Sequence, residues 1–251
     1  MSGHSKWASI KHKKAIVDSR RGQQFTKLAR AITVAARDGG GDPEANATLA
    51  TAVQKARDAS MPKDNIERAI AKGTGEGTDA DAIESVVYEG YGPGGVAIMV
   101  EALTDNRNRT GADVRHIFGK HAGALGEPGS VAYLFEKRGV IVVDATRWTE
   151  DDLEAAIDAG AEDISADGDI YEIVSDPASL TAVRAALERA GVEIDSAEVV
   201  QQPTSRVPLD EAHVGQLLRL LEALEADDDV NAVHANFDAD ADVLERVAAA
   251  G

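Results

Sequence analysis

Apolar residues recur every three or four positions along the first third of the chain, a pattern typical of amphipathic helices. Three helices are predicted, covering 18–37, 42–60 and 62–73. Gly39-Gly40-Gly41 ends the first pattern, and Asp42 before Pro43 has the character of an N-cap that opens the second helix. The apolar side of the first helix consists of Phe25, Leu28, Ala29, Ile32, Ala35 and Ala36.

Beyond residue 80 the pattern changes to short apolar runs separated by turns and helical segments, which indicates strands mixed with helices. The predicted elements are a strand at 85–88, a glycine-rich turn at 90–95, a strand at 96–103, a helix from Thr104 or Asp105 to Gly123 and a strand at 130–135. The two strands flanking the turn are expected to pair as a hairpin.

The next segment alternates strands and helices in the order βαββαβ, which predicts a ferredoxin-like arrangement. Its predicted elements are strands at 140–143, near Ile164, at 171–174 and at 192–200, with helices at 150–159 and 178–190. A helix at 209–226 and a strand at 230–234 follow. Because these last elements are too few to fold alone, we expect them to return and complete the sheet begun at Ser85.

The predicted fold class is therefore α+β, with three domains: an N-terminal three-helix domain, a middle α/β domain completed by C-terminal elements, and an inserted ferredoxin-like domain. The run from Gly73 to Asp79 has linker composition, with three glycines and no large apolar side chain. The predicted ranges are 1–73 for the helical domain, 74–79 for the linker, 80–136 with 204–240 for the middle domain, 137–203 for the insertion and 241–251 for a frayed helical tail.

Charge divides the chain unevenly. The formal net charge of the 251 residues is -18, yet residues 1–37 hold nine Lys or Arg and a single acid, Asp18. Split at Lys72, the two parts carry +7 and -25. A basic head attracts phosphate backbones and an acidic body repels them, so a nucleic acid is expected to contact one end of the molecule.

The sequence offers no clear enzyme or metal site, and we expect no catalytic residues, no metal and no cofactor. Cysteine is absent. Gly90, Gly92 and Gly95 match a dinucleotide fingerprint, but a strand follows where the fingerprint needs a helix, so a structural turn is the better interpretation. The acidic run that starts at Asp238 resembles a calcium loop but has Val243 where glycine is required.

The N-terminal basic residues form the first candidate binding site. Their charge is opposite to that of the rest of the chain, and aromatic rings that can stack on bases lie among them. The alternative is a charged face that only aids solubility. The candidate nucleic-acid-binding residues are His4, Lys6, Trp7, Lys11, His12, Lys13, Lys14, Arg20, Arg21, Lys27, Arg30 and Arg37.

A second candidate patch lies at the start of the helix that follows residue 104. Amides of a first helical turn and arginine side chains both suit phosphate. Ordinary capping with exposed arginines explains the same residues equally well. The patch comprises Asn106, Arg107, Asn108 and Arg109.

Several long motifs resemble the YebC/PmpR family. In order, they are G-H-S-K-W at 3–7, F-T-K-L at 25–28, G-G-G-D-P at 39–43, Y-E-G-Y-G-P-G-G at 88–95, D-N-R-N-R-T at 105–110, G-S-V-A-Y-L-F at 129–135 and D-S-A-E-V at 195–199. The resemblance implies a cytoplasmic protein of three domains, in agreement with the organisation predicted above.

The resemblance also implies a role in gene expression, with two modes open. Most of the family is described as DNA-binding transcriptional regulators. Mitochondrial relatives act as translational activators, and bacterial members have been tied to ribosomes stalled on proline runs. We therefore expect a non-enzymatic cytoplasmic regulator, a monomer without membrane contact, that binds promoter DNA or ribosomal RNA on the ribosome.

Overall fold

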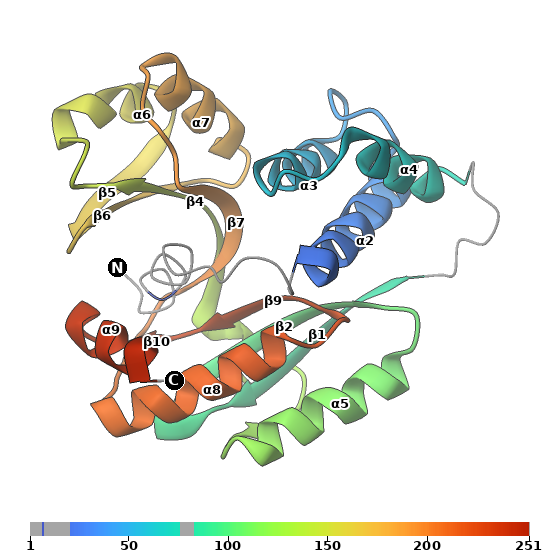
Figure 1. The fold of residues 1–251 in the computed structure, drawn as a ribbon, viewed down its shortest axis with the longest axis vertical. Coiled ribbons are helices and arrows are strands. Elements are labelled where there is room, and N and C mark those ends of the chain that lie inside the picture. Colours follow the sequence, from blue (N-terminus) through green and yellow to red (C-terminus); the bar gives the residue numbers. More distant parts are fainter. Residues whose placement is uncertain (1–6, 8–20, 76–82, 251) are drawn as a thin grey trace. The chain divides into compact units, whose positions relative to one another are not determined.

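The computed structural model describes Trp7, residues 21–75 and residues 83–250 (Figure 1). These residues form two compact units. One holds the described residues between 21 and 132 together with 216–233, and the other holds 133–215 together with 234–250. The fold is α+β, as predicted. The linker predicted at 74–79 falls largely outside the described residues, and the predicted domain ranges stay predictions.

The N-terminal helices pack around a small aliphatic core. Leu28 and Ile32 lie on the apolar face predicted for the first helix, and they meet Leu49, Val53 and Ile66 from the other two. The helices are α2 (Arg21–Gly39), α3 (Ala47–Asp58) and α4 (Lys63–Gly73).

The second helix begins four residues later than Asp42 predicted. Its N-cap is Asn46, whose side-chain oxygen accepts from the Leu49 amide at 3.0 Å. The Asn46 amide group also donates to the carbonyls of Ala35 and Gly40 at 2.8 Å each. Asn46 therefore caps α3 and ties it to the end of α2, which Asp42, an exposed residue, does not do.

The sheet of the first unit has the order β3-β1-β2-β9, so a C-terminal strand completes a sheet begun more than a hundred residues earlier, as predicted. Its elements are β1 (Glu84–Tyr91), a 3-10 turn η1 (Pro93–Gly95), β2 (Ala97–Thr104), α5 (Arg107–Lys120), β3 (Ala124–Leu125), α8 (Glu211–Glu225) and β9 (Val230–Ala235). β1 and β2 are antiparallel, with Glu84 opposite Thr104 and Tyr91 opposite Ala97.

Glycines allow helices to pack closely against β1. A Cβ atom on Gly90 would lie 2.8 Å from the Phe118 ring of α5, and one on Gly92 would lie 3.1 Å from Leu217 of α8. Gly92 follows the end of β1, and a Cβ atom on Gly123 would meet both Phe118 of α5 at 2.9 Å and Leu220 of α8 at 3.1 Å, so the two helices lie next to each other at this end of the sheet. The turn after Gly92 uses Gly94 at φ 74° and then leads into β2, not into a helix.

The inserted segment is ferredoxin-like, as predicted. Its antiparallel sheet has the order β5-β6-β4-β7, in which the first and third strands of the segment are central. Both helices pack on one face (Figure 1), through Ala156 of α6 and Val183 and Leu187 of α7. The elements are β4 (Phe135–Asp144), η3 (Glu150–Leu153), α6 (Glu154–Asp158), β5 (Ala161–Asp167), β6 (Ile170–Ser175), α7 (Leu180–Arg189) and β7 (Ser196–Pro203).

Two predicted strands are displaced. The strand expected at 130–135 is wrong, because Ala132–Leu134 forms the 3-10 turn η2 and β4 begins only at Phe135. The Glu89 carboxylate accepts from the amides of Gly129, Val131 and Ala132 at 2.6 to 2.7 Å, so these amides cannot join a strand ladder. The strand expected from Val192 begins at Ser196, because the Val192 amide donates to Leu187 and closes α7.

Short elements finish the chain. β8 (Val207–Pro208) and β10 (Phe237–Asp238) pair in parallel, and α9 (Ala241–Ala250) is the helix predicted for the tail. In the part of the chain that the structure describes, every helix is too short or too polar to cross a lipid bilayer.

Candidate nucleic-acid interface

Many of the predicted nucleic-acid-binding residues lie outside the described part of the chain. Trp7 is the exception near the N-terminus, and its side chain is buried, with 5% exposed. A base could stack on this indole only after the ring left its packing. Those outside the described residues are His4, Lys6, Lys11, His12, Lys13, Lys14 and Arg20.

The cationic side chains of α2 contact acceptors of the same unit. Lys27 donates to the Glu225 carbonyl at the end of α8, and Arg37 donates to the Ile83 carbonyl just before β1. Arg30 lies between them along the helix. α2 begins at Arg21. These three basic side chains of α2 therefore face protein acceptors, and phosphate would have to compete with them.

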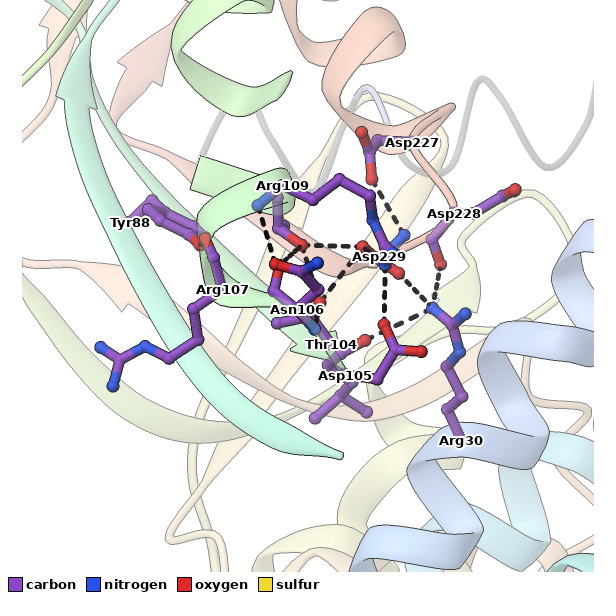
Figure 2. Close-up of polar contacts among 12 residues, drawn as sticks. Arg30, Tyr88, Thr104, Asp105, Asn106, Arg107, Arg109, Asp227, Asp228 and Asp229 are labelled. Carbon is purple, nitrogen blue, oxygen red and sulfur yellow. Dashed lines mark hydrogen bonds and ion pairs between the residues drawn. The ribbon is translucent and has the colours of Figure 1, made fainter. Parts of the chain in front are cut away.

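Arg30 reaches the turn between α8 and β9, and its main partner there is Asp229 (Figure 2). One guanidinium nitrogen lies 2.6 Å from the Asp229 carboxylate and 3.0 Å from the Asp228 carbonyl. The Arg30 side chain is 26% exposed and that of Asp229 only 7%. An ion pair so shielded from water is stronger than one on the open surface.

Asp229 also accepts hydrogen bonds from the start of α5, where the second predicted patch lies. Arg109 donates to its other carboxylate oxygen at 2.6 Å, and the Thr110 hydroxyl donates to the same oxygen at 2.7 Å (Figure 2). Thr104 lies 3.3 Å from that oxygen. One carboxylate thus joins α2, β2 and the start of α5, and brings Arg30 and Arg109, from the two separately predicted patches, to a single acceptor.

The electrostatics of this cluster keep Asp229 ionised. Burial would raise the pKa of its carboxyl, but the hydrogen bonds from Arg109, Thr110 and Arg30 outweigh that effect and lower the pKa to about 2. Glu89 behaves similarly. Burial would raise its pKa, and the three backbone hydrogen bonds from Gly129, Val131 and Ala132 lower it.

The remaining residues of the second patch divide between capping and exposure. Asn106 is the N-cap of α5 and accepts from the Arg109 amide at 3.1 Å, which occupies one of the amides that a phosphate would use. Arg107 and Asn108 are exposed, and Arg107 lies 3.6 Å from Glu84. Capping accounts for Asn106, and Arg109 is paired with Asp105 and Asp229, although all four residues of the patch are exposed.

Sequence reasoning missed Asp229. The residue ends the run Asp227-Asp228-Asp229, in a chain with 44 acidic residues, and nothing in its spacing marks it. No local signal points to it, because its partners are brought close only by the fold. Among the described residues, no group of three His, Asp or Glu side chains is arranged to hold a metal ion.

These features define a class of protein: a multidomain α+β chain with a basic N-terminal helical part and a ferredoxin-like unit inserted into a second sheet. Family models agree with this class. One described as "TACO1/YebC protein N-terminal domain" matches residues 5–76, and another described as "TACO1/YebC second and third domain" matches residues 83–237. The chain belongs to the TACO1/YebC family.

Relatives match almost the whole chain. A protein of Rubrobacter xylanophilus is 57% identical over 249 residues, 99% of this chain and 100% of the relative. One of Acidothermus cellulolyticus is 54% identical, covering 98% of this chain and 100% of the relative. Both carry the name "Probable transcriptional regulatory protein". The crystal structure of a conserved hypothetical protein from Aquifex aeolicus matches with a TM-score of 0.79 at 48% identity, covering 88% of this chain and 91% of that one.

Proposed function

We propose that this protein is a non-enzymatic, cytoplasmic, nucleic-acid-binding regulator of gene expression. Of its two candidate modes, we favour DNA-binding transcriptional regulation. The observation that carries the proposal is the charge division. Nine Lys or Arg against one acid in residues 1–37 stand before a body of charge -25. The names of the relatives support the transcriptional mode.

The hydrogen bonds of α2 support an assignment of the contact to residues outside this helix. Lys27, Arg30 and Arg37 already donate to protein acceptors, so the contact falls mainly on the basic residues before Arg21. Release of counterions from phosphates by such residues gives affinity without sequence preference. Specific regulation then requires further contacts to base edges or a deformable sequence.

A second candidate is a ribosome-associated translation factor that binds ribosomal RNA and relieves stalling on proline-rich nascent chains. Helix α4 favours it. This helix follows a four-residue turn after α3, the position of a recognition helix, yet it exposes Asp64 and Glu67 alongside Lys63 and Arg68. Acidic side chains at such positions oppose entry into a major groove, whereas RNA can be recognised through shape and backbone.

DNA binding is tested on genomic fragments. Fragments retained by the full chain at about 150 mM salt are sequenced, and the most enriched one is compared with its scrambled version. A specific regulator should bind the true fragment at least about a thousandfold more tightly. Equal affinity for both fragments would leave only the charge-driven binding that any basic segment has, and would refute the transcriptional mode.

Ribosome binding is tested by sedimentation through sucrose at moderate salt. The protein should travel with ribosomes, and Lys13→Glu with Lys14→Glu should abolish this. The matched control, Lys120→Glu with Lys137→Glu, makes the same charge change at exposed positions of the acidic body and should leave sedimentation unchanged. A protein that stays at the top of the gradient would exclude the translation mode.

A further inference from the structure

A groove of about 760 Å³ lies between α2 and α4, and of the residues predicted to bind nucleic acid only Arg30 lines it. Its volume is within the range of known ligand sites, which are roughly 300 to 1,000 Å³. Most of its lining comes from the two helices, and Met61, Ile83 and Asp105 lie outside them. The lining residues are Phe25, Thr26, Ala29, Arg30, Thr33, Met61, Asn65, Arg68, Ala69, Ala71, Lys72, Ile83 and Asp105.

The walls of this groove are cationic in a protein that is otherwise strongly acidic. Arg30, Arg68 and Lys72 line it, against one carboxylate, that of Asp105, which already accepts from Arg109 at 2.9 Å. Arg68 and Lys72 are four residues apart on α4, so both project along the same helix face. Both are exposed. An anion in the groove would meet at least two cations at once.

The rest of the groove is apolar. Phe25, Met61 and Ile83 contribute side chains that bury apolar surface, and Ala29 and Ala71 keep the space open. The Thr33 hydroxyl donates to the Ala29 carbonyl at 2.9 Å and lies 3.0 Å from the Ala69 carbonyl, so it is already satisfied within the protein. An occupant that uses both features combines an apolar part with negative charge on a neighbouring part.

We propose that this groove holds a short single-stranded segment of nucleic acid, with a base against the apolar side chains and phosphates against Arg68 and Lys72. The proposal rests on the proposed function and gives it a second contact besides the N-terminal basic residues. Single strands are bound in general by cationic grooves with apolar or aromatic stacking surfaces. A duplex is disfavoured because its bases are stacked inside and its groove edges would have to enter a concave site.

Fluorescence anisotropy of short oligonucleotides on the full chain tests the site. The probes are 5′-labelled hexamers of uridine RNA and thymidine DNA, which distinguish the two sources of a single strand, and a labelled DNA hairpin as the duplex. The hexamers should bind more tightly than the duplex stem. Arg68→Glu with Lys72→Glu should weaken hexamer binding at least about tenfold, since two phosphate contacts are lost.

The matched control is Lys55→Glu with Arg57→Glu, the same charge change on exposed positions of α3. It should weaken hexamer binding by less than about threefold. Equal losses of hexamer affinity in the two double variants would mean that charge alone attracts the strand. That result would refute binding in the groove. A labelled acidic hexapeptide that binds as tightly as the oligonucleotides would overturn the assignment to nucleic acid.

A third variant leaves the charge unchanged. Ala71→Phe places a ring into the groove from a half-buried position of α4, and thermal unfolding shows whether the fold survives it. Hexamer binding should fall at least about fivefold, because the base loses its place. If the groove variants have no effect while Lys13→Glu with Lys14→Glu abolishes binding of long nucleic acid, the groove is refuted and the proposed function stands. If no nucleic acid binds at all, both fail.

Discussion

Asp229 shows how much of an arrangement one side chain can determine. Its carboxylate accepts from two arginines and two threonines, which come from α2, β2 and α5. A nearly buried charge is tolerable only while these partners remain, and each arginine in turn depends on the carboxylate. Asp229 therefore has the most partners in the cluster. We expect its replacement to lower the free energy of unfolding more than that of any other residue in the cluster.

Replacing this carboxylate should destabilise the protein. Asp229→Ala leaves Arg30 and Arg109 without their shared acceptor, and the expected loss is about 2 to 4 kcal/mol of unfolding free energy, measured by urea denaturation. The neighbouring Asp228→Ala is the control. Asp228 contributes its backbone carbonyl to Arg30, which the substitution keeps. A loss as large for Asp228→Ala would show that the turn, and not the carboxylate of Asp229, supplies the stability.

The same residue predicts a pH dependence. The folded pKa of Asp229 is about 2, below the ordinary value of 3.8, so its contribution is complete above about pH 4 and is lost as the pH falls towards 2. The shift corresponds to about 2 kcal/mol. Unfolding free energy of the native protein should fall more steeply over this window than that of Asp229→Asn. Parallel curves for the two proteins would contradict the assignment.

At the scale of elements, apolar periodicity located most helices and strands, and backbone hydrogen bonding decided where they end. The ferredoxin-like order and the returning C-terminal strand followed from the alternation of short elements. The start of α3 did not, because an Asp-Pro pair gives the same local signal as a true cap. Asn46 is the cap because its amide also meets carbonyls at the end of α2, a contact that no local pattern contains.

This difference between Asp42 and Asn46 can be measured. Asn46→Ala removes the cap and two buried donors, and should lower unfolding free energy by about 2 to 3 kcal/mol. Asp42→Ala removes only an exposed bond to the Glu44 amide and should cost less than about 0.5 kcal/mol. Thermal unfolding of both variants by circular dichroism ranks them. The reverse order would restore Asp42 as the start of the helix.

The candidate site was predictable only as far as its features are local in the sequence. Charge contrast identified the basic residues of α2, and the helix-start pattern identified the arginines in the first turn of α5, since both are visible in the sequence alone. Their convergence on Asp229 was not predictable, because Arg30 and its partner are 199 residues apart and nothing local connects them. The groove between α2 and α4 was equally hidden, since it depends on which faces of two packed helices leave space.

At the scale of the whole molecule, charge division should control how binding responds to salt. The logarithm of the observed affinity for duplex DNA should fall linearly with the logarithm of salt concentration, with a slope of roughly 0.9 per phosphate contacted. Lys13→Glu with Lys14→Glu should reduce that slope by about 2. Titrations between about 50 and 300 mM salt measure it. The control Lys120→Glu with Lys137→Glu should keep the slope, and an equal reduction there would mean that the acidic body also lies on the DNA.

β9 is synthesised long after β2, and this order matters while the protein is being translated. β2 is buried along nearly its whole length, and its outer edge is covered only by β9, with Thr104 and Asp229 lying 125 residues apart. At about 5 to 20 residues per second, the nascent chain exposes that apolar edge for roughly 6 to 25 s. During this interval the exposed edge of β2 can pair with other chains. The nascent protein therefore needs protection there until β9 emerges.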